Sequence, residues 1–180
     1  MDIARARYLV SDSGQAAVRA NAGVDTSDPL RLATELRRSL PADEAAAVAE
    51  QLTLRERARR NHGRTDDWLY TSEGLEMLTH PLVAERRARR LASLGLSVVD
   101  LPCGLGGDLA PLVGLEVPST GMDRDTVHAM LAARNTGACI ARGDAANPPF
   151  DVGRLAVLLD PSRRKGGTRR FSRHGIRRVG

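Results

Sequence analysis

The sequence predicts an α/β protein in which an N-terminal helical segment is followed by a partial parallel sheet of about four strands. Residues 1–65 carry apolar side chains at three- and four-residue spacing and contain no strand pattern. From residue 97 onward, short apolar runs alternate with helical stretches, which is typical of parallel βαβ units. A glycine-rich turn, Cys-Gly-Leu-Gly-Gly at 103–107, directly follows the first of these runs.

The first part of the chain is expected to hold three helices, over residues 14–20, 29–40 and 42–61. They are rich in alanine, leucine, glutamate and arginine, which favour helix. Ser11 and Asp12 precede the first helix and Asp28 precedes the second, as N-capping residues do. Gly63 follows the third helix after a basic last turn, a common way for a helix to end.

The stretch from residue 66 to 95 connects these helices to the sheet. It holds the only tryptophan, Trp68, with Tyr70 close by, and then a helix over about 80–94. The two aromatic side chains are expected either to wedge the helical segment against the sheet or to form a lid over a ligand.

An acidic residue stands at the end of each of the four expected strands. The strands cover residues 97–101, 119–122, 138–143 and 155–159. The acids are Asp100, Asp123, Asp144 and Asp160. Because the carboxyl ends of parallel strands line one crevice, we expect the four side chains to meet in a single site.

The glycine turn and these acids favour an adenosine-containing ligand. Gly104, Gly106 and Gly107 would let a ligand approach the backbone where a side chain would block it. Asp123 is placed to accept hydrogen bonds from both hydroxyls of a ribose, and Asp144 to accept one from an exocyclic amine.

Each of these residues also has a purely structural interpretation. The glycines would form a tight strand–helix turn, Asp108 would cap the next helix, and Asp144 would cap a turn. Asp160-Pro161 would only terminate a strand. Cys103 and Cys139 are expected to be small packing residues rather than nucleophiles.

Taken in order, the motifs resemble class I S-adenosylmethionine-dependent methyltransferases. The similar runs are Asp-x-x-Cys-Gly-x-Gly-Gly-Asp from Asp100, Met-Asp-Arg-Asp from Met122, Gly-Asp-Ala from Gly143 and Leu-Leu-Asp-Pro-Ser-Arg-Arg from Leu158. The resemblance is specifically to the bacterial group with a C-terminal THUMP-like domain. It extends from about residue 10 to 171 and includes Leu-Tyr-Thr-Ser-Glu-Gly-Leu-Glu at 69–76.

The resemblance implies S-adenosylmethionine as cofactor and methyl transfer as reaction. It leaves the methyl acceptor open, with RNA as one candidate. Its cofactor-binding residues would be Asp100, Cys103, Gly104 and Gly106 around the methionine part, Asp123 at the ribose and Asp144 at the adenine. Its catalytic residues would be Asp160 and Pro161, at the edge of the methyl-transfer site. The implied domains are a helical domain at 1–65, a connecting helical segment at 66–95, a partial Rossmann-like methyltransferase domain at 96–165 and a basic tail at 166–180.

The chain departs from the family pattern at two points. Pro102 stands where the family has its first glycine, and it removes an N–H from the loop that should contact the cofactor. The family's sheet has seven strands, whereas four are found here and the THUMP-like domain is absent. These departures leave two alternatives open, a working methyltransferase and a truncated, inactive remnant of one. In either case the open edge of the last strand is available to pair with another chain.

Composition restricts the possible partners. Eight basic residues and no acidic ones lie in residues 161–180, and the remaining 19 basic residues face 22 acidic ones, so any nucleic-acid binding depends on this tail. Two cysteines, no membrane-length apolar run and no metal-binding histidine spacing predict a cytoplasmic protein without a metal or membrane partner.

The glycine turn argues against a nicotinamide dehydrogenase, because Leu109 stands where such an enzyme needs its third glycine. The remaining alternative is a non-catalytic interaction protein or nucleic-acid-binding fragment that uses the helical segment and the tail.

Overall fold

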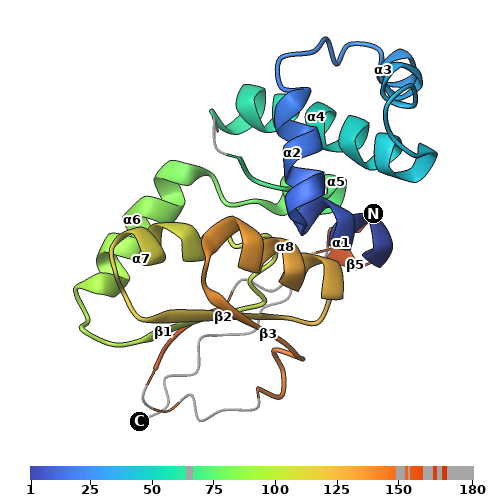
Figure 1. Ribbon diagram of the computed structural model, residues 1–180. Helices are drawn as coiled ribbons and strands as arrows, with labels where there is room; N and C mark the ends of the chain where they lie inside the picture. The colour runs from blue at the N-terminus through green and yellow to red at the C-terminus, as the bar shows by residue number, and fades with distance from the viewer. Residues whose placement is uncertain (64–66, 149–152, 154, 160–163, 166–167, 170–180) are drawn as a thin grey trace.

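The computed structural model describes residues 1–63, 67–148, 153, 155–159, 164–165 and 168–169. N-terminal helices pack at one side of a parallel sheet, and further helices cover one face of that sheet (Figure 1). The helices are α1 (Ile3–Val10), α2 (Asp12–Ala20), α3 (Pro29–Leu36), α4 (Ala42–His62), α5 (Ser72–Met77), α6 (Pro81–Ala92), α7 (Leu109–Gly114) and α8 (Thr126–Thr136). The strands are β1 (Val98–Leu101), β2 (Ser119–Asp123), β3 (Cys139–Arg142), β4 (Ala156–Leu159), β5 (Arg164–Lys165) and β6 (Thr168–Arg169).

Three of the N-terminal helices confirm the sequence prediction. The Oγ atom of Ser11 accepts a hydrogen bond from the Gly14 N–H at 3.2 Å and so caps α2. Asp28 caps α3 in the same way. α4 ends at Gly63, whose φ of 62° is the left-handed conformation that glycine adopts readily.

Helix α1 corrects the expectation that the first helix begins after Ser11. Asp2 caps this helix by accepting a hydrogen bond from the Arg5 N–H at 2.9 Å. Ala6 and Leu9 are fully buried against the other helices. With only two buried positions in eight residues, α1 has too short an apolar repeat to stand out in the sequence.

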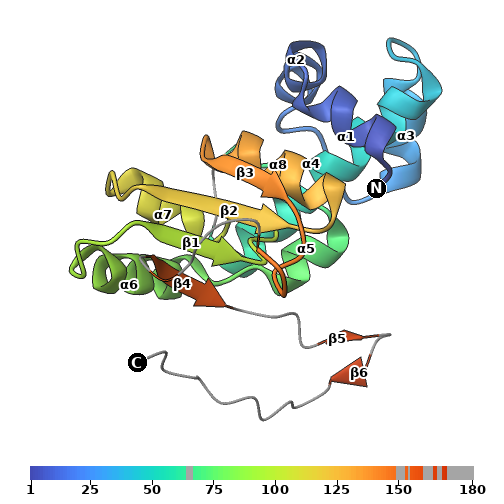
Figure 2. The same cartoon turned by 90° about the horizontal axis from the view of Figure 1, so that it is seen from below.

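The main sheet confirms the predicted α/β architecture. Its four strands are all parallel and lie in the order β3-β2-β1-β4 (Figure 2). Asp100 in β1 pairs with Gly121 in β2, and Asp123 at the end of β2 pairs with Arg142 at the end of β3. Because the strands run in one direction, their carboxyl ends share one edge of the sheet. The fold is a Rossmann-like α/β arrangement.

The helical part packs on the glycine turn and α8 in one apolar core. Leu105 in the glycine turn and Leu131 in α8 belong to the same buried cluster as the N-terminal helices. A second cluster lies between the sheet and its covering helices and includes Val98 and Leu112. The predicted domain boundaries at residues 65, 95 and 165 stay predictions.

The two aromatic side chains of the connecting segment are buried in the core, and their role as a lid stays a prediction. Trp68 and Tyr70 are 7% and 1% exposed, and their ring centroids lie 6.4 Å apart. Both belong to the apolar core in which the helical part packs on the glycine turn and α8. Two large aromatic side chains therefore stabilise the junction between the two parts.

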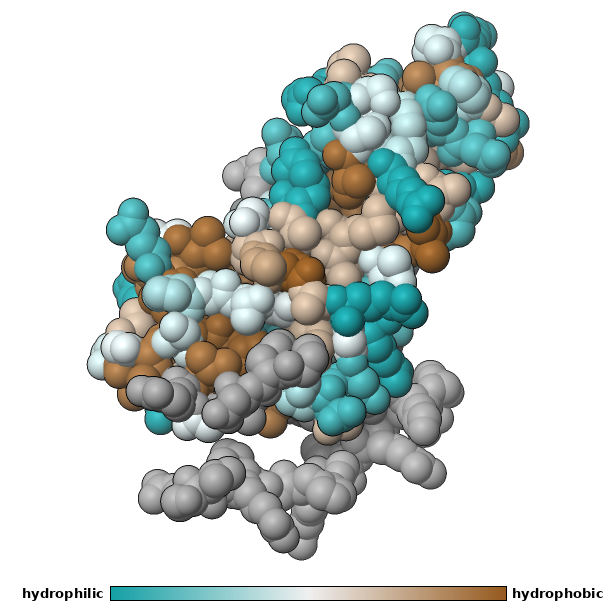
Figure 3. All heavy atoms as spheres, turned by 60° about the horizontal axis from the view of Figure 1, so that its bottom comes forward, coloured by the Kyte–Doolittle hydropathy of each residue, from teal (hydrophilic) through white to brown (hydrophobic). Residues whose placement is uncertain are grey.

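Strand β4 forms one edge of the described sheet, where it pairs with β1. Its Val157 and Leu159 are 37% and 62% exposed. Figure 3 shows apolar patches over the part of the molecule that contains the sheet, while hydrophilic side chains predominate over the N-terminal helices. Pairing of this edge with another chain stays a prediction. β5 and β6 form a separate antiparallel pair.

Candidate functional site at the glycine turn

The glycine turn needs glycine at two positions for different reasons. Gly104 and Gly106 have φ values of 53° and 86°, which other residues adopt at a cost. A Cβ atom on Gly106 would collide with Cγ2 of Thr136, whereas a Cβ on Gly104 would meet no described atom within 4 Å. Gly106 thus allows the turn to pack on α8, and Gly104 faces open space from which a ligand can approach the backbone.

Asp123 holds this turn to the end of β2. Its Oδ2 accepts a hydrogen bond from the Gly104 N–H at 2.9 Å, and its Oδ1 accepts one from the Asp125 N–H at 2.9 Å. The Cys103 N–H also donates to the Met122 carbonyl at 2.9 Å. Asp123 is 6% exposed, and its carboxylate lies beside the open space over Gly104. Each carboxylate oxygen keeps a second lone pair, so Asp123 can still accept bonds from a ligand.

Asp100 adds a second carboxylate to this edge, and the Cys103 thiol lies near both carboxylates. Asp100 is 3% exposed and Cys103 is 6% exposed. Burial, and then the carboxylates of Asp100 and Asp123, raise the pKa of the Cys103 thiol well above its usual range. The thiol is therefore neutral at physiological pH, as expected of a packing residue rather than a nucleophile.

Asp144 lies close in the chain to the end of β3 and is exposed. Its Oδ1 accepts a hydrogen bond from the Ala146 N–H at 3.0 Å, which is the turn cap allowed for in the sequence. The neighbouring Gly143 N–H donates to the Asp123 carbonyl at 3.0 Å, so this turn lies next to Asp123. Asp160 and Pro161 lie outside the described residues.

Asp108 differs from its predicted role. It stands at the N-cap position of α7, but its side chain makes no capping hydrogen bond. Instead, its Oδ1 accepts from Arg87 Nη1 at 2.8 Å and its Oδ2 accepts from Thr79 Oγ1 at 2.7 Å. The carboxylate thus ties the glycine turn to α6. In the sequence, Arg87 looks like one of several surface arginines on a helix, so nothing marked it as the partner.

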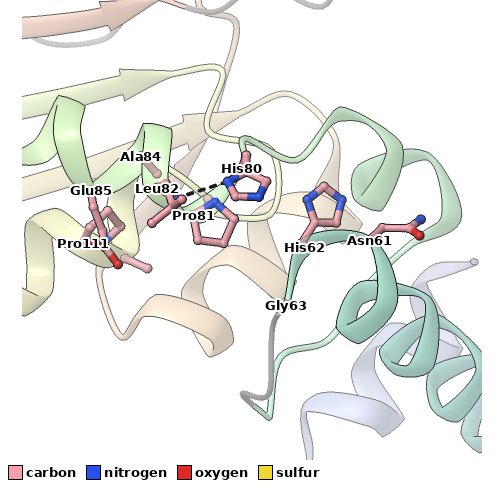
Figure 4. A pocket seen from close by; sticks show the side chains of 11 residues that line it. Asn61, His62, Gly63, His80, Pro81, Leu82, Ala84, Glu85 and Pro111 are labelled. Atoms are coloured by element: carbon pink, nitrogen blue, oxygen red, sulfur yellow. Dashed lines mark hydrogen bonds between the residues drawn. The ribbon is translucent and has the colours of Figure 1, made fainter.

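A cavity of about 700 Å³ lies behind the glycine turn, between the end of α4, the start of α6 and α7 (Figure 4). It meets the turn at Gly107, and none of the acidic residues Asp100, Asp123 and Asp144 lines it. His62 and His80 stand near each other there, with ring centroids 6.2 Å apart. His80 Nδ1 accepts a hydrogen bond from the Leu82 N–H at 3.3 Å and so caps α6.

A smaller cavity of about 240 Å³ lies on the other side, where α5 and α8 begin. It is lined by Thr71 and His128, whose side chains form a hydrogen bond of 3.1 Å, and by Asp125. The sequence did not mark Thr71 or His128, because the bond between them joins residues 57 positions apart.

No helix in the described part of the chain is long and apolar enough to cross a membrane. Within the same residues, no three histidine, cysteine, aspartate or glutamate side chains come together in a way that could hold a metal ion.

Similarity to known proteins covers most of the chain. A family model described as a domain of unknown function (DUF8688) matches residues 2–58. Two uncharacterized S-adenosylmethionine-dependent methyltransferases of Mycobacterium tuberculosis, from strains CDC 1551 / Oshkosh and ATCC 25618 / H37Rv, are each 38% identical over 141 residues. This chain is similar to S-adenosylmethionine-dependent methyltransferases. The match covers 72% of this chain and 38% of each relative, so the chain spans well under half of their length.

A solved structure agrees with the fold. The crystal structure of a candidate methyltransferase from Porphyromonas gingivalis W83 superposes with a TM-score of 0.55 and 22% sequence identity. The similarity covers 76% of this chain and 37% of that chain. At this identity the likeness supports the Rossmann-like fold alone.

Proposed function

We propose that this chain is the cofactor-binding part of an S-adenosylmethionine-dependent methyltransferase. One observation carries the proposal: a buried carboxylate, Asp123, bonds to a glycine turn that is open over Gly104. The two relatives named as S-adenosylmethionine-dependent methyltransferases support the choice of cofactor. A cytoplasmic location and membership of the group with a THUMP-like domain belong to the same proposal.

The described residues fit this cofactor in three places. Asp123 would accept from the ribose hydroxyls while keeping the turn in place. The missing side chain at Gly104 would let the methionine part lie against the backbone. The negative charges of Asp100 and Asp123 would stabilise the positive sulfonium, and the neutral thiol of Cys103 would pack beside it.

When bound, S-adenosylmethionine supplies an electrophilic methyl group. The protein would contribute alignment and a negative lining. Asp144 would accept from the adenine amine, although its one described side-chain contact is the turn cap. Asp160 and Pro161 would edge the transfer site, with Asp160 orienting the acceptor or taking its proton.

Isothermal titration tests the cofactor proposal. S-adenosylmethionine and its demethylated product, S-adenosylhomocysteine, should both release or absorb heat on binding and raise the melting temperature. The proposal would be rejected if millimolar ligand produced no heat of binding and no rise in melting temperature. The glycine turn would then be only a strand–helix connection.

RNA is the proposed acceptor, because eight basic residues and no acidic ones lie in residues 161–180. The competing function, a non-catalytic nucleic-acid-binding fragment, uses the same feature. The two differ in cofactor binding, so titration separates them. RNA retention should fall steeply between about 50 and 200 mM salt and disappear when residues 161–180 are deleted. Retention that survives the deletion would reject the tail as the binding element.

A further inference from the structure

The connecting segment at 68–71 runs between α4 and α8 without joining a sheet. Its backbone at Leu69 is paired instead with one side chain, that of Asn135 in α8. Asn135 Oδ1 accepts from the Leu69 N–H at 2.8 Å, and Asn135 Nδ2 donates to the Leu69 carbonyl at 3.0 Å. Leu69 is fully buried, so its backbone groups need hydrogen-bond partners. The side-chain amide of Asn135 supplies the two partners that a neighbouring strand would otherwise provide.

The same amide also reaches the glycine turn. Asn135 Nδ2 makes a second hydrogen bond, to the carbonyl of Leu105 at 3.2 Å. Leu105 lies between Gly104 and Gly106 and is 2% exposed. A Cβ on Gly74 of α5 would lie 2.7 Å from the Leu105 side chain, so the turn is held closely on this side. One side chain therefore links the turn to the connecting segment.

Gln51 on α4 provides a natural comparison. Its Oε1 accepts from the Tyr70 N–H at 2.9 Å, and its Nε2 donates to the Tyr70 carbonyl at 2.6 Å. Gln51 is fully buried and pairs with the residue next to Leu69. Its two described hydrogen bonds both go to Tyr70 and none to the glycine turn. Both amides hold the backbone of the connecting segment, and only Asn135 of the two also bonds to the glycine turn.

We propose that Asn135 is a positioning residue for the cofactor-binding turn, an inference that rests on the proposed function. The Asn135 amide fixes the Leu105 carbonyl by a hydrogen bond. It thereby maintains the turn conformation in which the Gly104 N–H donates to Asp123 and the space over Gly104 is open. Without its donor, the Leu105 carbonyl would turn toward another partner, because a buried carbonyl is costly to leave unpaired. Cofactor affinity would then fall.

The test compares Asn135→Asp with Gln51→Glu. Each change keeps the shape of the side chain and the acceptor for a backbone N–H, and each replaces the donor by a carboxylate oxygen. Both variants should unfold at lower urea concentration than the wild type. Asn135→Asp should weaken S-adenosylhomocysteine binding about tenfold or more, and Gln51→Glu should leave it within about twofold.

The pH dependence gives a readout that a purely structural role would not produce. In Asn135→Asp the carboxylate faces the carbonyls of Leu69 and Leu105, so protonation restores one donor. The affinity of this variant should therefore recover as pH falls, while that of the wild type and Gln51→Glu should not. Equal affinity of the two variants, or no recovery, would overturn the proposal.

Hydrogen exchange of the wild type covers the case in which Asn135→Asp fails to fold. On binding S-adenosylhomocysteine, the Leu69 amide should become more protected, since its acceptor is the side chain that holds the turn. Binding without added protection at Leu69 would refute the positioning role alone. A wild type that binds neither S-adenosylmethionine nor S-adenosylhomocysteine would reject the proposed function, and the positioning role with it.

Discussion

Replacing Gly106 by alanine is expected to destabilise the protein by about 2–3 kcal/mol. The φ of 86° costs an alanine about 1 kcal/mol. The new Cβ would also collide with Cγ2 of Thr136, which has little freedom to move. Thr136 Oγ1 donates to the Ala132 carbonyl at 2.8 Å and accepts from the Ala138 N–H at 3.1 Å, and rotating the side chain would break both hydrogen bonds at about 1 kcal/mol each.

Urea unfolding followed by tryptophan fluorescence measures this effect, because Trp68 is the only tryptophan and is 7% exposed. Adding Thr136→Ser removes the clashing methyl group and keeps the hydroxyl, so it should recover about 1–2 kcal/mol relative to Gly106→Ala alone. Gly104→Ala is the control: it should cost about 1 kcal/mol of stability but impair cofactor binding. Equal stability of the Gly104→Ala and Gly106→Ala variants would refute the reasoning.

Four further outcomes are expected. Asp123→Ala should weaken S-adenosylhomocysteine binding by about 1–3 kcal/mol in isothermal titration, and an unchanged affinity would reject the ribose assignment. Arg87→Met leaves the carboxylate of Asp108, a residue that is 8% exposed, without its cation and should cost about 2 kcal/mol in urea unfolding. Adding Asp108→Asn should recover part of this, and additive losses would show that the pair is not coupled. Iodoacetamide should label the exposed Cys139 and leave Cys103 unlabelled until the protein unfolds. Because burial raises the pKa of Cys103 above its ordinary 9.0, the unfolded chain loses this proton first, so stability should fall as pH rises past that value; Cys103→Ala should remove this slope, and an unaltered slope would contradict its origin.

Local sequence patterns were sufficient to predict most of the elements. The four parallel strands follow from short apolar runs that alternate with helical stretches, and the caps at Ser11 and Gly63 follow from residue types that satisfy helix ends. The acids at the strand ends predicted a shared site, because parallel strands bring their carboxyl ends to one edge of the sheet. Asp123 lies against the glycine turn for this reason.

The sequence by itself thus determined the α/β class, the position of the glycine turn and the presence of acids at the strand ends, because each depends on periodicity or on a neighbouring residue. Only the tertiary structure decided that Asp108 pairs with Arg87 rather than capping α7, and that Asn135 holds Leu69 and the turn together. These bonds join residues 21, 66 and 30 positions apart. No local pattern encodes such pairs, because they form only when packed helices bring side-chain amides and charges to buried groups that need partners.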